Sequence, residues 1–257
     1  MRYLNVGSGS KGNSTIIYTA QATIIIDCGV SRKRVVDCLR SIGRSLEEVD
    51  AMLITHRHKD HTAHIESFEC LKDRTYSGDA GVIDPQFQST NVLKSFQRIE
   101  IAGLAITALP TSHDAPDSMG YLLEDLANGR RLMYMTDTGY IPFKDLNYCR
   151  DCDFYLLESN HDPETLMRSD RNNWLKMRIL SDKGHLSNQQ CAHYLTLLVG
   201  SRTKEVALAH LSGECNTPQL ALATFNDAFI AQFGQVPTLT LKTLDQKTPI
   251  GGGDTIN

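Results

Sequence analysis

Residues 51–61 read AMLITHRHKDH, and this stretch decides the fold. The run AMLI is apolar and too short for a helix, which is typical of a buried strand that ends where the polar residues begin. Four side chains that can bind metal follow within six positions: His56, His58, Asp60 and His61. Two imidazoles at i and i+2 can face one cation, and the Asp and His that follow can face a second. The stretch therefore predicts a two-metal site on the loop where a strand leaves its sheet.

The composition is that of an ordinary globular protein. The chain has 257 residues, of which 41% are hydrophobic and 22% are charged. Its net charge of −4 does not favour nucleic-acid binding in general, so such binding requires a local basic patch. No apolar run is long enough to cross a membrane, and none is expected to do so. The seven scattered cysteines and the absence of a signal peptide predict reduced thiols in a cytoplasmic protein.

Polar side chains also follow other predicted strands. The strands are expected at residues 15–18, 22–27, 51–54, 101–109, 120–123, 131–135, 154–157 and 206–209. Helices are expected at 31–43, 187–199 and 217–234. The strands end in Asp27, His56, His113, Asp137, Glu158 and His210. Layered α/β folds place their sites at strand ends, so these groups are expected to converge. Residues 1–247 are predicted to form a single domain, and the glycine-rich residues 248–257 a disordered tail.

Two segments contain candidate substrate contacts. The loop GSGSKGNS at 7–14 combines glycines with a lysine but lacks the order of a nucleotide P-loop. Residues 166–185 hold five basic side chains against two acidic ones, around the only tryptophan, Trp174. That ring could stack on a base or simply pack its segment. The candidate contacts in these two segments are Ser10, Asn13, Arg168, Arg171 and Lys183.

The motifs resemble a known family. The pattern HxHxDH at 56–61, followed by His113, Asp137 and His210, is similar to the metallo-β-lactamase superfamily. The stretches GSGSKGNST, TDTGY, ESNHD, GHLS and AHLS resemble its YycJ/WalJ-like branch, which is related to ribonuclease Z and regarded as DNA exonucleases. The resemblance implies a four-layer αββα sandwich around a dinuclear centre.

The resemblance also implies roles for individual residues. His56, His58 and His113 would bind one metal, Asp60, His61 and His210 the other, and Asp137 would bridge both. Glu158 would orient His185, and Asp60, His185 and Glu158 would carry the chemistry. In that scheme a metal-bridging hydroxide attacks phosphorus. Asp27 would support a ligand imidazole from behind, and His161 in ESNHD is a further candidate substrate contact. Zinc and manganese suit these ligands equally well.

The function expected from the resemblance is a DNA exonuclease that acts from the 5′ end. The resemblance favours DNA over RNA as the substrate. The 24 positions from His113 to Asp137 are too few for the arm with which ribonuclease Z grips tRNA, so the site is expected to be comparatively open. A phosphodiesterase of cyclic nucleotides and an RNA-processing nuclease of ribonuclease Z type stay open as alternatives. A binding protein with a degraded site would lack ligands, and none is missing. The resemblance leaves a homodimer open and predicts no membrane contact.

Overall fold

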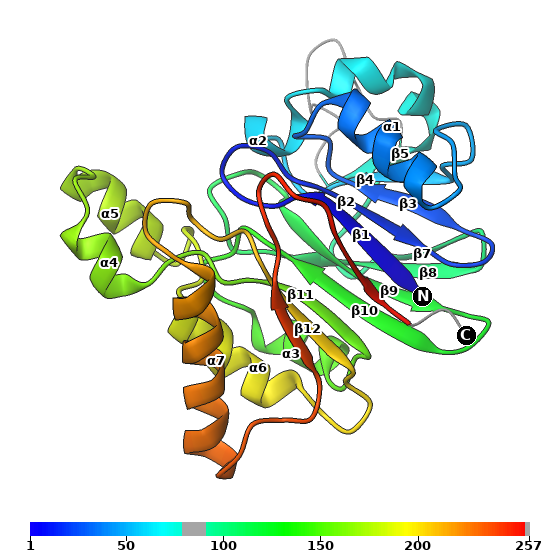
Figure 1. Cartoon of the computed structure of the whole chain (residues 1–257). Helices are drawn as coiled ribbons and strands as arrows, with labels where there is room; N and C mark the ends of the chain where they lie inside the picture. The colour runs from blue at the N-terminus through cyan, green and yellow to red at the C-terminus, as the bar shows by residue number, and fades with distance from the viewer. Residues whose placement is uncertain (79–90, 255–257) are drawn as a thin grey trace.

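The computed structural model describes residues 1–78 and 91–254, which form two β-sheets between two layers of helices (Figure 1). The first sheet has the order β14-β1-β2-β3-β4-β5-β6 and the second β13-β12-β11-β10-β9-β8-β7. The strands of the first sheet are β1 (Arg2–Gly7), β2 (Ser14–Tyr18), β3 (Thr23–Ile26), β4 (Ala51–Ile54), β5 (Thr75–Ser77), β6 (Asn91–Val92) and β14 (Ile250–Gly253). Those of the second are β7 (Arg98–Ile101), β8 (Leu104–Pro110), β9 (Met119–Asp125), β10 (Arg130–Met135), β11 (Phe154–Glu158), β12 (Glu205–Ala209) and β13 (Thr240–Thr243).

Helices cover the outer face of each sheet. The first sheet is covered by α1 (Arg32–Ser41) and the 3-10 helix η1 (Ile65–Arg74), and the short α2 (Lys59–Thr62) follows β4. The second is covered by α3 (Phe143–Cys149), α6 (Asn188–Leu198) and α7 (Pro218–Phe233). Figure 1 shows α4 (Pro163–Arg168) and α5 (Asn173–Leu180) projecting to one side. No helix in the described ranges is long and apolar enough to span a membrane.

Three apolar layers hold the four structural layers together. In β3, Ile24 and Ile26 pack between the two sheets, whereas Ile25 packs toward α1. In β11, Leu156 faces the other sheet and Tyr155 faces α6. Strands buried on both faces need apolar side chains at every position, which explains the continuous apolar runs in the sequence. The predicted αββα sandwich is confirmed.

The sequence correctly predicted the ends of those strands and helices whose boundaries are set by residues of the segment itself. Strand β4 occupies the predicted residues Ala51–Ile54. Helix α6 begins with a capping box in which Ser187 and Gln190 each bond to the other's backbone. Helix α7 begins after the N-cap Thr217 and ends at Gly234 in the left-handed conformation.

Two expectations about the chain were wrong. The predicted strand at 101–109 is confirmed from Leu104 onward as β8, but its start was wrong: Ala102 and Gly103 both have positive φ and form a hairpin turn, so that Ile101 belongs to the preceding strand β7. The predicted disordered tail contains β14, which pairs antiparallel with β1. Backbone hydrogen bonds form this edge strand, so it needs no apolar periodicity. A Cβ on Gly252 would lie 2.0 Å from Glu205 Oε1, which explains the glycine there.

The strand directions bring the candidate residues to one edge. Strands β3, β4 and β5 are parallel to one another, as are β10, β11, β12 and β13. Carboxyl ends of parallel strands meet at the same edge of a sheet. Asp27 therefore lies next to the loop after β4. In the second sheet, Asp137, Glu158 and His210 lie at the ends of neighbouring strands.

Candidate metal centre

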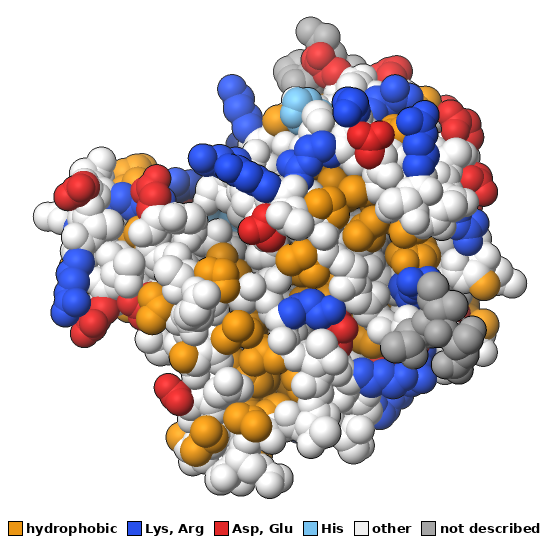
Figure 2. Space-filling model, viewed as in Figure 1, with side chains coloured by type: hydrophobic (Ala, Val, Ile, Leu, Met, Phe, Trp, Pro, Cys, Tyr) orange, Lys and Arg blue, Asp and Glu red, His pale blue; other side chains and the backbone are white. Residues whose placement is uncertain are grey.

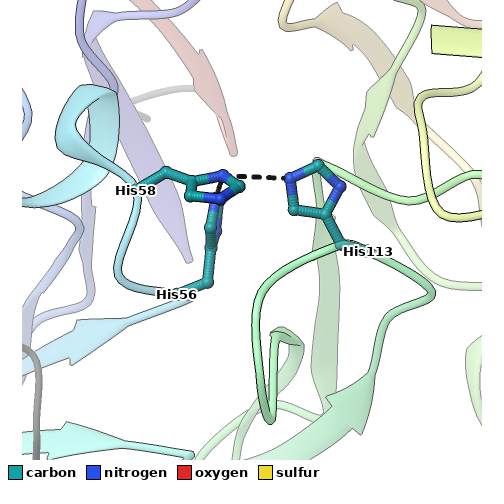
Figure 3. A group of neighbouring side chains, drawn as sticks. All are labelled: His56, His58 and His113. Carbon is teal, nitrogen blue, oxygen red and sulfur yellow. Dashed lines mark hydrogen bonds between the residues drawn. The ribbon is translucent and has the colours of Figure 1, made fainter. Parts of the chain in front are cut away.

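Three imidazoles from two segments converge at the edge of the sandwich (Figure 3). His56 and His58 lie on the loop after β4, and His113 lies on the loop after β8. The Nε2 atom of His56 is 3.1 Å from Nδ1 of His58, and that Nδ1 is 3.2 Å from Nε2 of His113. The three nitrogens therefore face one another.

This first cluster has the spacing of a metal site. A tetrahedral zinc ion with Zn–N bonds of 2.0–2.1 Å holds its nitrogen ligands about 3.3 Å apart. Facing lone pairs repel unless a proton or a metal ion lies between them. Burial lowers the pKa of His56 well below its ordinary value and also lowers the pKa of His58, so a proton is disfavoured. The cluster is suited to a cation that binds neutral imidazoles.

A second cluster lies beside the first and contains carboxylates. Its members are Asp60, His61, Asp137 and His210. Nε2 of His61 is 3.1 Å from Oδ2 of Asp137 and 3.5 Å from Oδ2 of Asp60. Nε2 of His210 is 3.6 Å from Oδ2 of Asp60 and has no hydrogen-bond partner among the described residues. A buried imidazole nitrogen without a partner, aimed at a carboxylate, fits a metal ligand.

The charges of the second cluster also fit a cation. Burial opposes ionisation of Asp137, yet His210 and His61 together hold the pKa of this carboxyl well below its usual range. Burial equally opposes protonation of His210, but Asp137, Asp60 and Glu158 raise its pKa. In the absence of a metal ion, these three carboxylates therefore keep the imidazole of His210 protonated. A metal ion would replace that proton.

Asp137 reaches both clusters. Its Oδ2 lies 3.1 Å from His61 Nε2 in the second cluster, and its Oδ1 lies 4.0 Å from His113 Nε2 in the first. The side chain is buried at the end of β10. Oδ1 also lies 3.5 Å from Nδ1 of His210 in the second cluster, so this carboxylate lies between the two clusters, where a bridge between two metals would have to be.

Three residues of the site share an unusual backbone. Asp27, Asp137 and His210 follow β3, β10 and β12, and their φ angles are 62°, 56° and 55°. The left-handed conformation costs a non-glycine residue roughly 1–2 kcal/mol. Such strain persists where the surrounding structure fixes it, and it concentrates at functional sites. Here the sharp turn at each strand end directs the side chain to the shared edge.

Asp27 supports His61 from the side away from the second cluster. Its Oδ2 is 2.7 Å from Nδ1 of His61, and its Oδ1 accepts a hydrogen bond from the Thr55 backbone N–H at 2.8 Å. All three residues are buried. The Nδ1 contact fixes the tautomer so that Nε2 presents a lone pair to the cluster.

Glu158 contacts two histidines with one oxygen. Oε1 is 2.8 Å from Nδ1 of His185 and 2.9 Å from Nδ1 of His210. Oε2 accepts hydrogen bonds from the backbone N–H groups of Thr138 and Leu186. Burial opposes the charge on Glu158, but His185 and the hydrogen bonds lower its pKa to about 2. Burial opposes the charge on His185 as well, yet Glu158 raises its pKa.

The predicted substrate contacts are in several environments. Asn13 is buried, and its Nδ2 lies 3.0 Å from His61 Nε2, so it is part of the metal centre's surroundings. Ser10 and Lys183 are exposed. Arg168 is exposed beside Glu164, whereas Arg171 is half-buried and bonds to Glu214 at 3.0 Å.

His161 lies in the interior. Its side chain is 1% exposed, and neither ring nitrogen has a hydrogen-bond partner in the described part of the chain. Burial lowers its pKa to about 4. The His161 carbonyl accepts a hydrogen bond from the Asn188 backbone N–H, which holds the segment after β11 against the start of α6. In this position the imidazole is neutral near pH 7.

Sequence reasoning missed two residues at the mouth of the site. Oδ1 of Asp114 lies 3.5 Å from His58 Nε2 and 3.4 Å from His113 Nε2. Its other oxygen accepts a hydrogen bond from Nε of Arg178 on α5 at 2.6 Å. Asp114 directly follows a predicted ligand, which was a usable signal. Its partner is 64 positions away, and nothing local indicates that pairing.

These clusters and the αββα sandwich define a metal-binding hydrolase fold, and comparison with known proteins agrees. Residues 22–210 match the family described as the beta-lactamase superfamily domain, and the chain belongs to this family.

Individual relatives narrow the comparison. The chain is 33% identical over 241 residues to exodeoxyribonuclease WalJ of Streptococcus pneumoniae serotype 2, covering 87% of this chain and 86% of that protein. It is 29% identical over 259 residues to exodeoxyribonuclease YycJ of Bacillus anthracis, covering 95% of each chain. The crystal structure of the metallo-beta-lactamase fold protein YhfI from Bacillus subtilis is similar in fold, with a TM-score of 0.69, 15% identity and coverage of 98% and 99%. The predicted membership of the WalJ/YycJ-like branch is confirmed.

Proposed function

We propose that the protein is a dinuclear-metal-dependent phosphodiesterase that degrades DNA from the 5′ end. The observation that carries the proposal is the pair of His185 and Glu158 beside the two ligand clusters, with an Nδ1–Oε1 distance of 2.8 Å. A metal centre alone suits many hydrolytic reactions. An oriented imidazole next to that centre adds a proton donor, which cleavage of a phosphodiester needs for the leaving oxygen.

The ligand assignment follows the two clusters. His56, His58 and His113 would hold one divalent cation, and Asp60, His61 and His210 the other, with Asp137 shared. When bound, two divalent cations polarise a phosphoryl oxygen and lower the pKa of water towards neutrality. Both zinc and manganese fit nitrogen and carboxylate ligands. Asp27 and Glu158 hold His61 and His210 by their Nδ1 atoms, which leaves Nε2 for the metal.

His185 is the proposed proton donor. Its Nδ1 is engaged by Glu158, so Nε2 is the nitrogen left to face a substrate. The side chain is 21% exposed, so a solute can reach it. Because Glu158 raises the pKa of His185, the imidazole keeps its proton to a higher pH than a free histidine. Asp60 contributes to the reaction as a ligand of the second cation.

The choice of DNA is supported by the relatives and by the surface. WalJ and YycJ, to which this chain is similar over most of its length, are named exodeoxyribonucleases. Residues 166–185, on and after α4 and α5, carry five basic side chains against two acidic ones in a chain whose net charge is −4, and Arg168 and Arg171 pair there with Glu164 and Glu214. Phosphate contacts of this kind provide affinity without sequence preference. Arg168, Arg171 and Lys183 are the proposed contacts.

A substrate panel tests the proposal. The purified protein, supplied with manganese or zinc, is incubated with duplex DNA labelled at either the 5′ or the 3′ end, with single-stranded RNA and with cyclic nucleotides. We expect early release of labelled mononucleotide from the 5′-labelled DNA and slow loss of the 3′ label. Intact DNA together with opened cyclic phosphate would favour the cyclic-nucleotide alternative and contradict the proposal.

A further inference from the structure

A basic pocket lies next to the metal centre and belongs to neither ligand cluster. Its volume is about 270 Å³. Four loops from distant parts of the chain line it, and the lining residues are Ser10, Lys11, Arg171, Leu211, Gly213, Glu214, Gln246 and Lys247. Figure 2 shows Lys and Arg side chains gathered on this face over the loop between β1 and β2. We propose that this pocket binds the 5′-terminal phosphate of a DNA strand, one nucleotide away from the bond that is cleaved.

The pocket is adjacent to the metal centre through two chain segments. Leu211 follows the proposed ligand His210 directly. Lys11 is two residues from Asn13, whose Nδ2 lies 3.0 Å from Nε2 of His61. Two residues span at most about 7 Å of chain. A strand held with one phosphate at the cations therefore brings a neighbouring phosphate within reach of the pocket.

The charge of the pocket suits a phosphate monoester. Three cationic side chains line it, those of Lys11, Arg171 and Lys247, against the single carboxylate of Glu214. Glu214 pairs with Arg171 at 3.0 Å. Lys11 and Lys247 have no ion-pair partner among residues 1–78 and 91–254. A terminal phosphate has a second ionisation near pH 6 and carries close to two negative charges, whereas an internal diester carries one. Two unpaired lysines match the terminal group better.

The backbone around the pocket is fixed in advance. Oε1 of Gln246 accepts a hydrogen bond from the Lys11 N–H at 2.8 Å, and its Nε2 donates to the Gly12 carbonyl at 2.8 Å. Arg34 donates to the carbonyl of Lys247 at 3.0 Å. Neither lysine uses its side chain in these bonds. The loops are thus held in place while both ammonium groups stay available to a ligand, which reduces the entropy lost on binding.

The size of the pocket favours a strand end over a continuous duplex. A volume of about 270 Å³ is below the range of roughly 300–1,000 Å³ that is typical of drug-sized ligands, so it accommodates little beyond one phosphate and its sugar. Recognition of the terminal phosphate would fix the distance from the end to the cleaved bond. The identification of the ligand as DNA rests on the proposed function.

Binding tests the pocket separately from cleavage. In a His185→Ala background, which is expected to slow cleavage strongly, fluorescence anisotropy measures the affinity for an oligonucleotide carrying a 5′-phosphate, a 5′-hydroxyl or a 3′-phosphate. We expect the 5′-phosphate strand to bind about tenfold more tightly than the other two, which corresponds to one strong charge contact.

The double substitution Lys11→Gln with Lys247→Gln should remove this preference, and it leaves the loop hydrogen bonds intact. Lys33→Gln with Lys94→Gln removes the same charge elsewhere on the surface and should preserve the preference.

Three results would overturn the inference. These are equal binding of the three strands, an undiminished preference in the Lys11 and Lys247 variant, and an equal loss in the control variant. The proposed function has a different failure. Selective binding of the 5′-phosphate without cleavage of any DNA by the wild type would refute the nuclease and support the pocket. DNA cleavage without selective binding would refute the pocket alone.

Discussion

Oε1 of Glu158 lies 2.8 Å from Nδ1 of His185, and the same oxygen lies 2.9 Å from Nδ1 of His210. One buried carboxylate therefore positions both a proposed proton donor and a proposed metal ligand. The two histidines come from segments 25 residues apart, before α6 and after β12. In the proposed mechanism Glu158 links the proton donor to the metal ligands, and the first two predictions separate these roles.

Replacing His185 should abolish turnover without removing metal. In His185→Ala we expect both metal ions to remain, because the imidazole is absent from both proposed ligand sets, and kcat to fall by about 10²–10⁴. Asp137→Ala should instead lose metal, since the Asp137 carboxylate lies next to histidines of both clusters. Elemental analysis and steady-state kinetics on the same preparations check this. Equal metal loss in the two variants would contradict the separate roles.

Glu158→Gln should change the pH dependence of the reaction. In the proposed mechanism the protonated form of His185 is active, so activity should be present below its raised pKa and decline as the pH rises through it. Without the carboxylate that pKa falls, and the alkaline decline should begin at a lower pH. We also expect a rate loss of about 10- to 100-fold at neutral pH. If the variant lost activity equally at every pH, Glu158 would have a purely structural role.

Asp27→Asn should weaken metal binding. The substitution removes the charge that faces Nδ1 of His61 at 2.7 Å and frees the imidazole to turn. Partners of this kind are worth about 10- to 100-fold in metal affinity. Competition with a coloured chelator measures the change. Asp50→Asn is the matched control, because Asp50 also accepts a backbone hydrogen bond, from Thr23, but lies at the start of β4. Similar losses in both variants would count against the role of Asp27.

The buried carboxyl of Asp145 on α3 is expected to lower the free energy of unfolding at alkaline pH, independently of catalysis. Neither carboxyl oxygen has a hydrogen-bond partner in the described residues, and burial raises its pKa to about 7. When the pKa of a carboxyl is higher in the folded than in the unfolded protein, the free energy of unfolding falls as the pH rises from about 4 to 7. Asp145→Asn should therefore raise the free energy of unfolding by about 1–3 kcal/mol at pH 8 and much less at pH 4. Urea unfolding at the two pH values measures it, and the same gain at both would refute the explanation.

Much of the fold could be predicted because local patterns and burial agree. The apolar run before His56 is buried on both faces as β4, and the capping box at Ser187 begins a helix that packs against Tyr155. The strand-end rule found Asp27, Asp137 and His210 because parallel strands bring their ends together whatever the loops between them contain.

The rest depends on contacts between distant residues. Strand β14 consists of Ile250 and three glycines and exists because β1 offers a free edge, which no local pattern indicates. Arg178 reaches Asp114 because α5 packs beside the loop after β8, a contact between residues that are distant in the sequence. Likewise, the loop that contains Asn13 has the composition of a phosphate-binding loop. In the structure the loop folds over the candidate metal centre, and Nδ2 of Asn13 contacts Nε2 of His61.

The central claim is that two cations occupy two neighbouring clusters. A crystal of the protein grown with zinc or manganese, with anomalous diffraction measured at the metal edge, tests it most directly. We predict two anomalous peaks about 3.5–4 Å apart. One should lie among His56, His58 and His113, and the other among Asp60, His61 and His210, with Asp137 between them. An absence of peaks at these residues in metal-soaked crystals, or a single peak away from Asp137, would contradict the account.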